Sequence, residues 1–211
     1  LDVAIPPDQD DNLEIGLNTT FSGTFYKGSS ESGEYIDWGK RRHSVTTEDT
    51  SWTTSLAGSY DFNLDGSGVD VVIQDSGLQV DHPEFIDANG VSRVQQIDWY
   101  AASGISGTQN ANHYRDLDGH GTHCAGTAAG KSFGWAKNAR VYSVKVNGLE
   151  GAGDSGTGIS ISNCFDVIKL WHRNKPIDPV TGQKRPTIVN MSWGYSTSAT
   201  SITASYLLYS F

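Results

Sequence analysis

The sequence predicts an α/β fold in which a parallel β-sheet carries helices on both faces. Three apolar runs rich in β-branched residues, at 69–77, 140–146 and 187–194, have the length and composition of buried strands. Helical patterns separate these runs, and strands that alternate with helices pair in parallel. Ligands of such sheets bind at the carboxyl ends of the strands, so the residues that end each run are the first candidates for a site.

The helices are predicted from spacing and from small residues. THCAGTAAG at 122–130 predicts a helix of small residues that enters the core, and SITASYLLYS at 201–210 predicts a final helix. A third helix is predicted between the second and third strands, from about 157 to 173. Its apolar residues recur at spacings of three and four, at Ile161, Cys164, Phe165, Ile168 and Trp171.

The chain divides near residue 65 into an acidic extension and the α/β unit at 66–211. Residues 1–65 carry 12 acidic and 4 basic side chains, whereas 66–211 carry 12 and 11. The extension is polar and rich in turn residues, which predicts irregular structure with a few short strands. The chain has no basic stripe, so nucleic acid is not an expected partner.

The compartment is left open by the sequence. No apolar stretch is long enough to span a membrane, so no membrane partner is expected, and LDVAIPPDQDDN lacks the basic start and apolar run of a signal peptide. Cys124 and Cys164 lie on different predicted helices, and we expect both to be free thiols.

Asp75 and His120 are the first candidates for chemistry. Asp75 ends the first predicted strand, and His120 stands between Gly119 and Gly121 where a helix begins. A carboxylate beside an imidazole makes a charge-stabilised general base, because it fixes the tautomer and stabilises the imidazolium. The plainer alternative is that Asp75 opens a turn and His120 caps a helix.

Five segments, in order, resemble the subtilisin-like serine proteases and, within them, the proteinase K branch. They are VVIQDSGLQVDHPEF, DGHGTHCAGTAAG, GWAKNARVYSVKV, EGAGDSG and VNMSWG, all within residues 66–211. The resemblance implies the subtilisin-like α/β fold, with Asp75 as the orienting acid and His120 as the general base. It also implies two edges, Gly151-Ala152-Gly153 and Ser192-Trp193-Gly194, between which an extended peptide substrate would lie.

Two departures from the family pattern matter. The Gly-Thr-Ser-Met-Ala motif of the nucleophile and the Ala-Ala-Gly-Asn stretch of the oxyanion-stabilising asparagine do not occur in the 211 residues. Ser76, Ser155 and Ser192 do not stand on helix starts among small neighbours, so none has the setting of an activated nucleophile. Trp193 replaces the commoner small aliphatic residue, either as a wall of the substrate pocket or as a core aromatic.

We therefore expect this chain to hold the acid, the base and the cleft of a serine endopeptidase that is inactive alone. A C-terminal remainder carrying the serine would be the continuation of the chain or a cleaved partner that stays docked. The alternative is a protease-derived structural or interaction module, such as an autocleaved component of a larger assembly like a virion.

No cofactor or metal is expected, with calcium as the open alternative. Asp61, Asn63, Asp65 and Gly66 begin like a calcium loop, but the twelfth position is Val72, so a turn is the better interpretation. His120 and His123 are spaced as zinc ligands could be, but the surrounding glycines argue against zinc.

Overall fold

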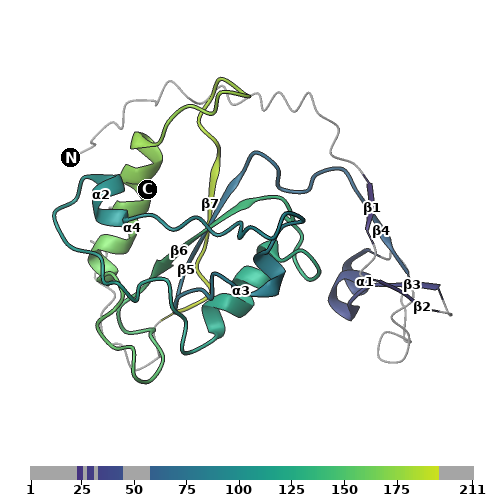
Figure 1. The fold of residues 1–211 in the computed structure, drawn as a ribbon, viewed down its shortest axis with the longest axis horizontal. Helices are drawn as coiled ribbons and strands as arrows, with labels where there is room; N and C mark the ends of the chain where they lie inside the picture. The colour runs from purple at the N-terminus through teal and green to yellow at the C-terminus, as the bar shows by residue number, and fades with distance from the viewer. Residues whose placement is uncertain (1–22, 26–27, 31–32, 45–57, 195–211) are drawn as a thin grey trace, which may run out of the picture.

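The computed structural model describes residues 23–25, 28–30, 33–44 and 58–194, and it has a parallel three-stranded sheet at its centre (Figure 1). Strand β5 (Asp70–Asp75) lies between β6 (Arg140–Lys145) and β7 (Thr187–Asn190). Both neighbours run parallel to β5, with Val71 opposite Val141 on one side and Ile188 on the other. The predicted α/β fold is therefore confirmed.

Helices cover both faces of this sheet, as expected. Helix α3 (His120–Ala129) packs against one face, in a cluster that includes Val71, Ile73 and Val141. The opposite face is covered by α2 (Trp99–Ser103) and α4 (Ile161–Asn174), which share a cluster with Val72 and Val144. Because β5 is paired on both edges and covered on both faces, all six of its residues are buried.

Helix α4 begins at Ile161 rather than near residue 157. The residues before it are extended, because Ile159 forms a parallel bridge with Val146. The Ile159 amide donates to the Lys145 carbonyl at 2.7 Å, and the Asn147 amide donates to the Ile159 carbonyl at 2.8 Å. The stretch after Gly156 thus continues the sheet edge before it turns into the helix.

The third strand is shorter and more exposed than the sequence predicts. The apolar run suggested a buried strand over 187–194, but β7 ends at Asn190 and Ile188 is 59% exposed. Within the described ranges β7 pairs only with β5 and lies at the edge of the sheet. A strand with one paired edge keeps part of its apolar face in contact with solvent.

The described part of the first 65 residues holds a group of short elements. Strand β1 (Gly23–Phe25) pairs antiparallel with β4 (Tyr60–Phe62), and β2 (Gly28–Ser30) pairs with β3 (Gly33–Tyr35). The few short strands were expected, but helix α1 (Trp38–Ser44) was not. Figure 1 shows these elements together, to one side of the central sheet.

This group is attached to the α/β unit by the segment after α3. The buried Lys40 ammonium donates to the Asp37 carboxylate at 2.9 Å and to the Ser132 carbonyl at 3.2 Å. The rings of Tyr60 and Trp135 lie 5.1 Å apart. The extension therefore packs on the α/β unit near Ser132 and Trp135. The boundary near residue 65 stays a prediction.

Three further expectations concern the cysteines, the membrane and the last helix. Cys124 and Cys164 are both free, as predicted, but only Cys164 is fully buried. In the part of the chain that the structure describes, no helix combines the length and the apolar character needed to cross a membrane. The helix predicted at 201–210 lies outside the described residues.

Candidate active site

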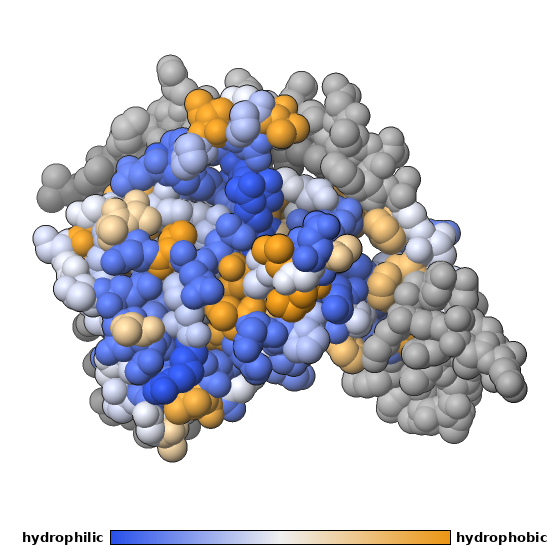
Figure 2. All heavy atoms as spheres, in the orientation of Figure 1, coloured by the Kyte–Doolittle hydropathy of each residue, from blue (hydrophilic) through white to orange (hydrophobic). Residues whose placement is uncertain are grey.

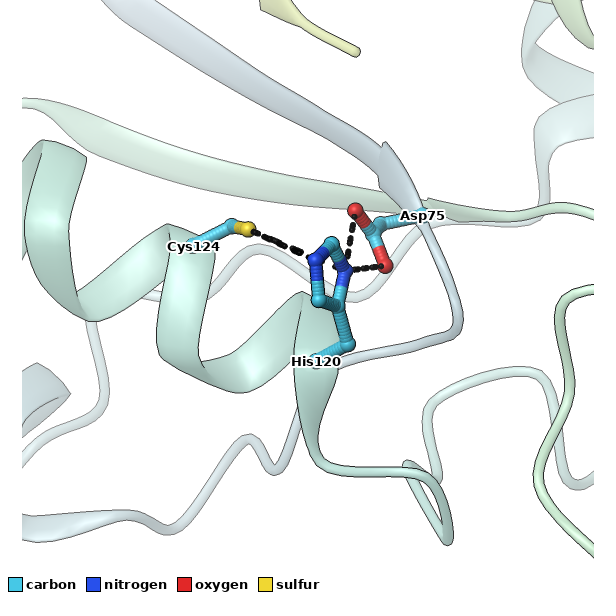
Figure 3. A group of neighbouring side chains, drawn as sticks. All are labelled: Asp75, His120 and Cys124. Atoms are coloured by element: carbon cyan, nitrogen blue, oxygen red, sulfur yellow. Dashed lines mark hydrogen bonds and ion pairs between the residues drawn. The ribbon is translucent and has the colours of Figure 1, made fainter. Parts of the chain in front are cut away.

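Asp75 and His120 lie in direct contact, as Figure 3 shows. Nδ1 of His120 is 2.8 Å from Oδ1 and 3.1 Å from Oδ2 of Asp75. Asp75 is the last residue of β5 and its side chain is 2% exposed, whereas His120 begins α3 and its side chain is 50% exposed. The expected contact is present, and it leaves one face of the imidazole open to solvent.

A close backbone approach brings α3 to the end of β5. A Cβ on Gly121 would lie 2.1 Å from the carbonyl oxygen of Gly77, a distance that no side chain tolerates. The Gly121 amide donates to the Ser76 hydroxyl at 2.9 Å. The glycine after His120 is therefore required by the backbone of the Asp75–Gly77 turn, which it must touch for His120 to reach Asp75.

Asp116 organises the loop that precedes His120. Its carboxylate accepts hydrogen bonds from the Ser76 hydroxyl, the Gly119 amide, and both the amide and the hydroxyl of Thr122. Burial alone would raise the pKa of Asp116, but these donors hold it below its ordinary value. Asp116 thus joins the turn after β5 to the first turn of α3.

The contact with Asp75 also sets the charge behaviour of His120. The hydrogen bond and the negative charge of Asp75 raise the pKa of the imidazole above its ordinary value. Because Nδ1 faces a carboxylate, Nδ1 carries the hydrogen of the neutral ring and Nε2 carries the lone pair. The arrangement can accept a proton at Nε2.

Cys124 lies one turn after His120 on the same helix, and its thiol faces the ring (Figure 3). Its Sγ is 3.8 Å from Nδ1 and 3.9 Å from Nε2 of His120. Burial raises the pKa of the Cys124 thiol, so the thiol stays protonated near neutral pH and lacks the thiolate character of a nucleophile. In the sequence, this contact is indicated only by the i, i+4 spacing of His120 and Cys124 on a helix.

The segment Gly151-Ala152-Gly153 forms a turn rather than a strand in this structure. The Asp154 amide donates to the Gly151 carbonyl at 3.1 Å, and Gly153 has a φ of +87°, in the left-handed region that favours glycine. A Cβ on Gly151 would lie 2.5 Å from the Asp118 amide nitrogen. This turn therefore lies directly against the loop that leads into His120.

Asp154 fixes the turn to its surroundings. Its buried carboxylate pairs with the ammonium of Lys145, which is itself fully buried at the end of β6, and with the guanidinium of Arg115. Arg115 Nε donates at 3.0 Å, and the Lys145 ammonium also donates to the Arg115 carbonyl at 2.8 Å. The sequence analysis did not single out Asp154, because nothing local in EGAGDSG indicates its partners.

The second predicted edge, Ser192-Trp193-Gly194, follows β7. Ser192 and Gly194 are exposed, whereas Trp193 is half-buried and packs against the cluster around Trp99 and Val144. The Ser192 hydroxyl interacts with the Cys124 thiol, which brings this segment beside the His120 helix. Trp193 thus contacts the core, as the second interpretation expects, and its place as a wall of the substrate pocket stays a prediction.

The serines considered as nucleophiles make other contacts. The Ser76 hydroxyl donates to Asp116 at 2.9 Å, and that of Ser192 donates to the Asn190 side chain at 3.1 Å. Within the described part of the chain, the ring nitrogens of His120 meet only Asp75 and Cys124.

Two groups of possible metal ligands can be placed. In the segment that begins like a calcium loop, Asp65 accepts from the Ser67 amide at 2.8 Å and from the Asn138 amide group at 2.7 Å, as in a turn. Elsewhere, donor atoms of Asp75, His120 and Cys124 lie within 4.8 Å of one another, a set that could hold a thiophilic ion.

Comparison with known proteins places this geometry in context. The sequence profile of the Subtilase family (Peptidase S8) matches residues 66–208. Proteinase R of Parengyodontium album is 34% identical over 167 residues, which are 79% of this chain and 36% of that protein. A cuticle-degrading serine protease of Arthrobotrys oligospora is 36% identical over 126 residues, which are 60% of this chain and 28% of that protein.

The chain therefore spans about a third of the length of these curated relatives. Among solved structures, a cold-adapted subtilisin-like serine proteinase superposes with a TM-score of 0.51 at 26% identity. The superposition covers 83% of this chain and 52% of that protein.

Proposed function

The chain belongs to the subtilase family, and on that premise we propose that it supplies the acid, the base and part of the substrate cleft of a serine endopeptidase. The observation that carries this proposal is the 2.8 Å contact between His120 Nδ1 and the buried carboxylate of Asp75. Half of the His120 side chain is exposed, and a nucleophile and a substrate are proposed to approach Nε2 from this side.

The proposed reaction uses the two nitrogens of His120 differently. Asp75 accepts the hydrogen of Nδ1 and so keeps the lone pair on Nε2. Nε2 takes the proton of a serine hydroxyl as the serine oxygen attacks the peptide carbonyl, and Asp75 stabilises the imidazolium that forms. The same proton then passes from Nε2 to the leaving amine, which leaves an acyl-enzyme for water to hydrolyse.

The serine and the oxyanion-stabilising asparagine are proposed to come from polypeptide outside these 211 residues. The 211 residues contain neither family motif. The edge position of β7 supports the proposal, since Ile188 is 59% and Met191 48% exposed. A further strand beside β7 would bury these side chains and pair the open edge.

The substrate is proposed to be an extended peptide between the Gly151–Gly153 turn and the Ser192–Gly194 segment. Ala152, Gly153, Ser192 and Gly194 are exposed, so their backbones are accessible to a peptide. Glycines on such an edge let a substrate backbone approach closely.

Labelling with a serine-directed fluorophosphonate tests this proposal. We expect no labelled serine in the purified 211-residue chain, and labelling in the protein that also carries the serine motif. His120→Ala in that protein should abolish both labelling and peptide hydrolysis, whereas His82→Ala should retain them. A labelled serine within the 211 residues that depends on His120 would contradict the placement of the nucleophile.

The alternative of an interaction module has its own outcome in the same experiment. If the protein with the serine motif neither labels nor hydrolyses any peptide while circular dichroism shows it folded, the endopeptidase proposal is wrong.

A further inference from the structure

Leu117 is a large apolar side chain that stays in solvent three residues before His120. It is 50% exposed, although a leucine of this size would normally be covered. A Cβ on Gly153 would lie 4.0 Å from Leu117 Cδ1, so the leucine borders the exposed side of the glycine turn. Leu117 therefore lies where the His120 loop and the proposed substrate edge meet.

The backbone around Leu117 has little freedom to bury this side chain. On one side, Gly151 is so close that a Cβ there would lie 2.5 Å from the Leu117 carbonyl carbon. On the other side, the Asp116 carboxylate binds the Gly119 amide at 2.9 Å. Tight packing of the backbone on both sides holds the Leu117 side chain in its exposed position.

An ion pair between the partly exposed Arg115 and the buried Asp154 fixes the same geometry. Arg115, two residues before Leu117, donates from Nε to the Asp154 carboxylate at 3.0 Å, and Asp154 directly follows Gly153. Asp154 is also paired with the fully buried Lys145. The loop of Leu117 and the turn of Gly153 are thus connected through one carboxylate and hold a constant spacing.

We propose that Leu117 is a specificity-determining residue, forming the apolar wall of a subsite for one substrate side chain between His120 and the Gly151–Gly153 turn. This inference rests on the proposed endopeptidase function and adds the substrate class: peptides with an aliphatic side chain at that position. Binding would cover the exposed leucine and remove apolar surface of both partners from water.

The charges beside Leu117 favour the same substrates. Asp118 is exposed and its carboxylate accepts from the His120 amide at 3.2 Å, so a negative charge borders the subsite. Asp116 and Asp154 use their oxygens on protein donors. An acidic substrate side chain at this position would meet the Asp118 carboxylate, whereas the Arg115 guanidinium is already paired with Asp154, and we expect such a substrate to be the least favoured.

The test measures kcat/KM on a peptide series in which one residue at a time is Leu, Ala, Lys or Glu. It uses the protein that carries the serine motif. Wild type should prefer Leu over Ala about tenfold or more at a single position, the range that hydrophobic pockets give for a few methylenes. Leu117→Ala should reduce that preference to near unity, and Leu117→Lys should make Glu better than Lys there. Preferences at every other position should stay unchanged.

Val180→Lys is the matched control, because Val180 is 91% exposed on the loop between α4 and β7. That loop lies at the end of the sheet away from α3 (Figure 1), and Figure 2 shows apolar side chains in the same place. This substitution adds the same charge to the same protein and should change no preference.

Each outcome bears on the inference in its own way. A wild type that cleaves peptides while Leu117→Lys keeps its full profile would overturn the subsite and leave the endopeptidase function standing. An equal loss of kcat/KM on all peptides would also overturn it, because it would indicate only damage to the fold. A folded wild type that hydrolyses nothing would refute the endopeptidase function, and the subsite with it.

Discussion

Gly121 and Gly77 touch through their backbones, and this contact decides whether His120 reaches Asp75. The carbonyl oxygen of Gly77 occupies the space where a Cβ of residue 121 would be, at 2.1 Å. Relieving such a clash requires the first turn of α3 and the end of β5 to move apart. The glycine that follows the histidine is thus a condition for the acid–base pair.

Gly121→Ala should therefore separate His120 from Asp75 and destabilise the fold by about 1–3 kcal/mol, the usual cost of overpacking. Gly126→Ala in the same helix is the control, since no atom outside the helix lies within 4 Å of a Cβ there. That substitution should stabilise the helix by up to about 1 kcal/mol. Urea unfolding of both variants measures the difference, and a Gly121→Ala variant as stable as wild type would contradict the contact.

His120 should titrate above the ordinary histidine value of about 6.5, because Asp75 raises its pKa. The protonated ring cannot accept a proton, so the proposed peptide hydrolysis by the protein that carries the serine motif should fall as the pH falls through this pKa. Since the folded-state pKa is raised, the contribution of the pair to stability is complete below the unfolded value and is lost as the pH rises through the folded one. NMR titration of the His120 ring carbons measures this pKa.

In the protein that carries the serine motif, Asp75→Asn should lower kcat by roughly 10⁴-fold, the loss typical when an asparagine imposes the wrong imidazole tautomer in a serine protease. The pKa of His120 should fall in the same variant, because the charge that raises it is gone. Asp87→Asn, which changes an exposed turn elsewhere, is the control. A loss smaller than tenfold would show that Asp75 does not orient the base.

Asp154→Ala should destabilise the fold by about 3–5 kcal/mol, because it leaves the fully buried Lys145 ammonium without a negatively charged partner. Arg115→Gln removes only a partly exposed partner and should cost much less than Asp154→Ala. Urea denaturation separates the two. Equal costs would mean that the Lys145 charge finds another partner.

The Asp154 carboxylate should also make the stability of the fold depend on pH in the acid range. The hydrogen bonds and charges of Arg115 and Lys145 lower the pKa of Asp154 to about 2. Its contribution to stability is therefore complete above its unfolded pKa of about 3.9 and is lost as the pH falls toward 2. The free energies of unfolding of wild type and Asp154→Asn should converge as the pH falls over that range. A difference that stays constant with pH would argue against the pair.

The two cysteines should react at very different rates. Burial raises the pKa of Cys164 to about 12 and leaves its side chain without solvent contact, whereas Cys124 is only half-buried. A thiol reagent should therefore label Cys124 first in the native protein and both cysteines after denaturation. Mass spectrometry of the labelled peptides, with Cys124→Ser as control, gives the order, and native labelling of Cys164 first would contradict the packing of α4.

The sequence by itself predicted the strands and the acid–base pair. Apolar residues stand at successive positions in both runs, Val71–Ile73 in β5 and Val141–Tyr142 in β6, because a parallel strand covered by helices buries side chains on both of its faces. Asp75 and His120 were identified from the segments around them. The glycines and small residues beside His120 are needed because α3 approaches the Asp75–Gly77 turn closely.

Only the tertiary structure decided how the loops around His120 are held. Asp154, Lys145 and Arg115 come from three separate segments, and no periodicity or spacing relates a buried carboxylate to partners so far along the chain. The turn at Gly151–Asp154 and the exposure of Leu117 depend on the packing of these two segments against each other, and the later start of α4 depends on the bridge between Val146 and Ile159. Local sequence determines which residues can form a strand or a helix, whereas the positions of loops follow from packing between distant segments.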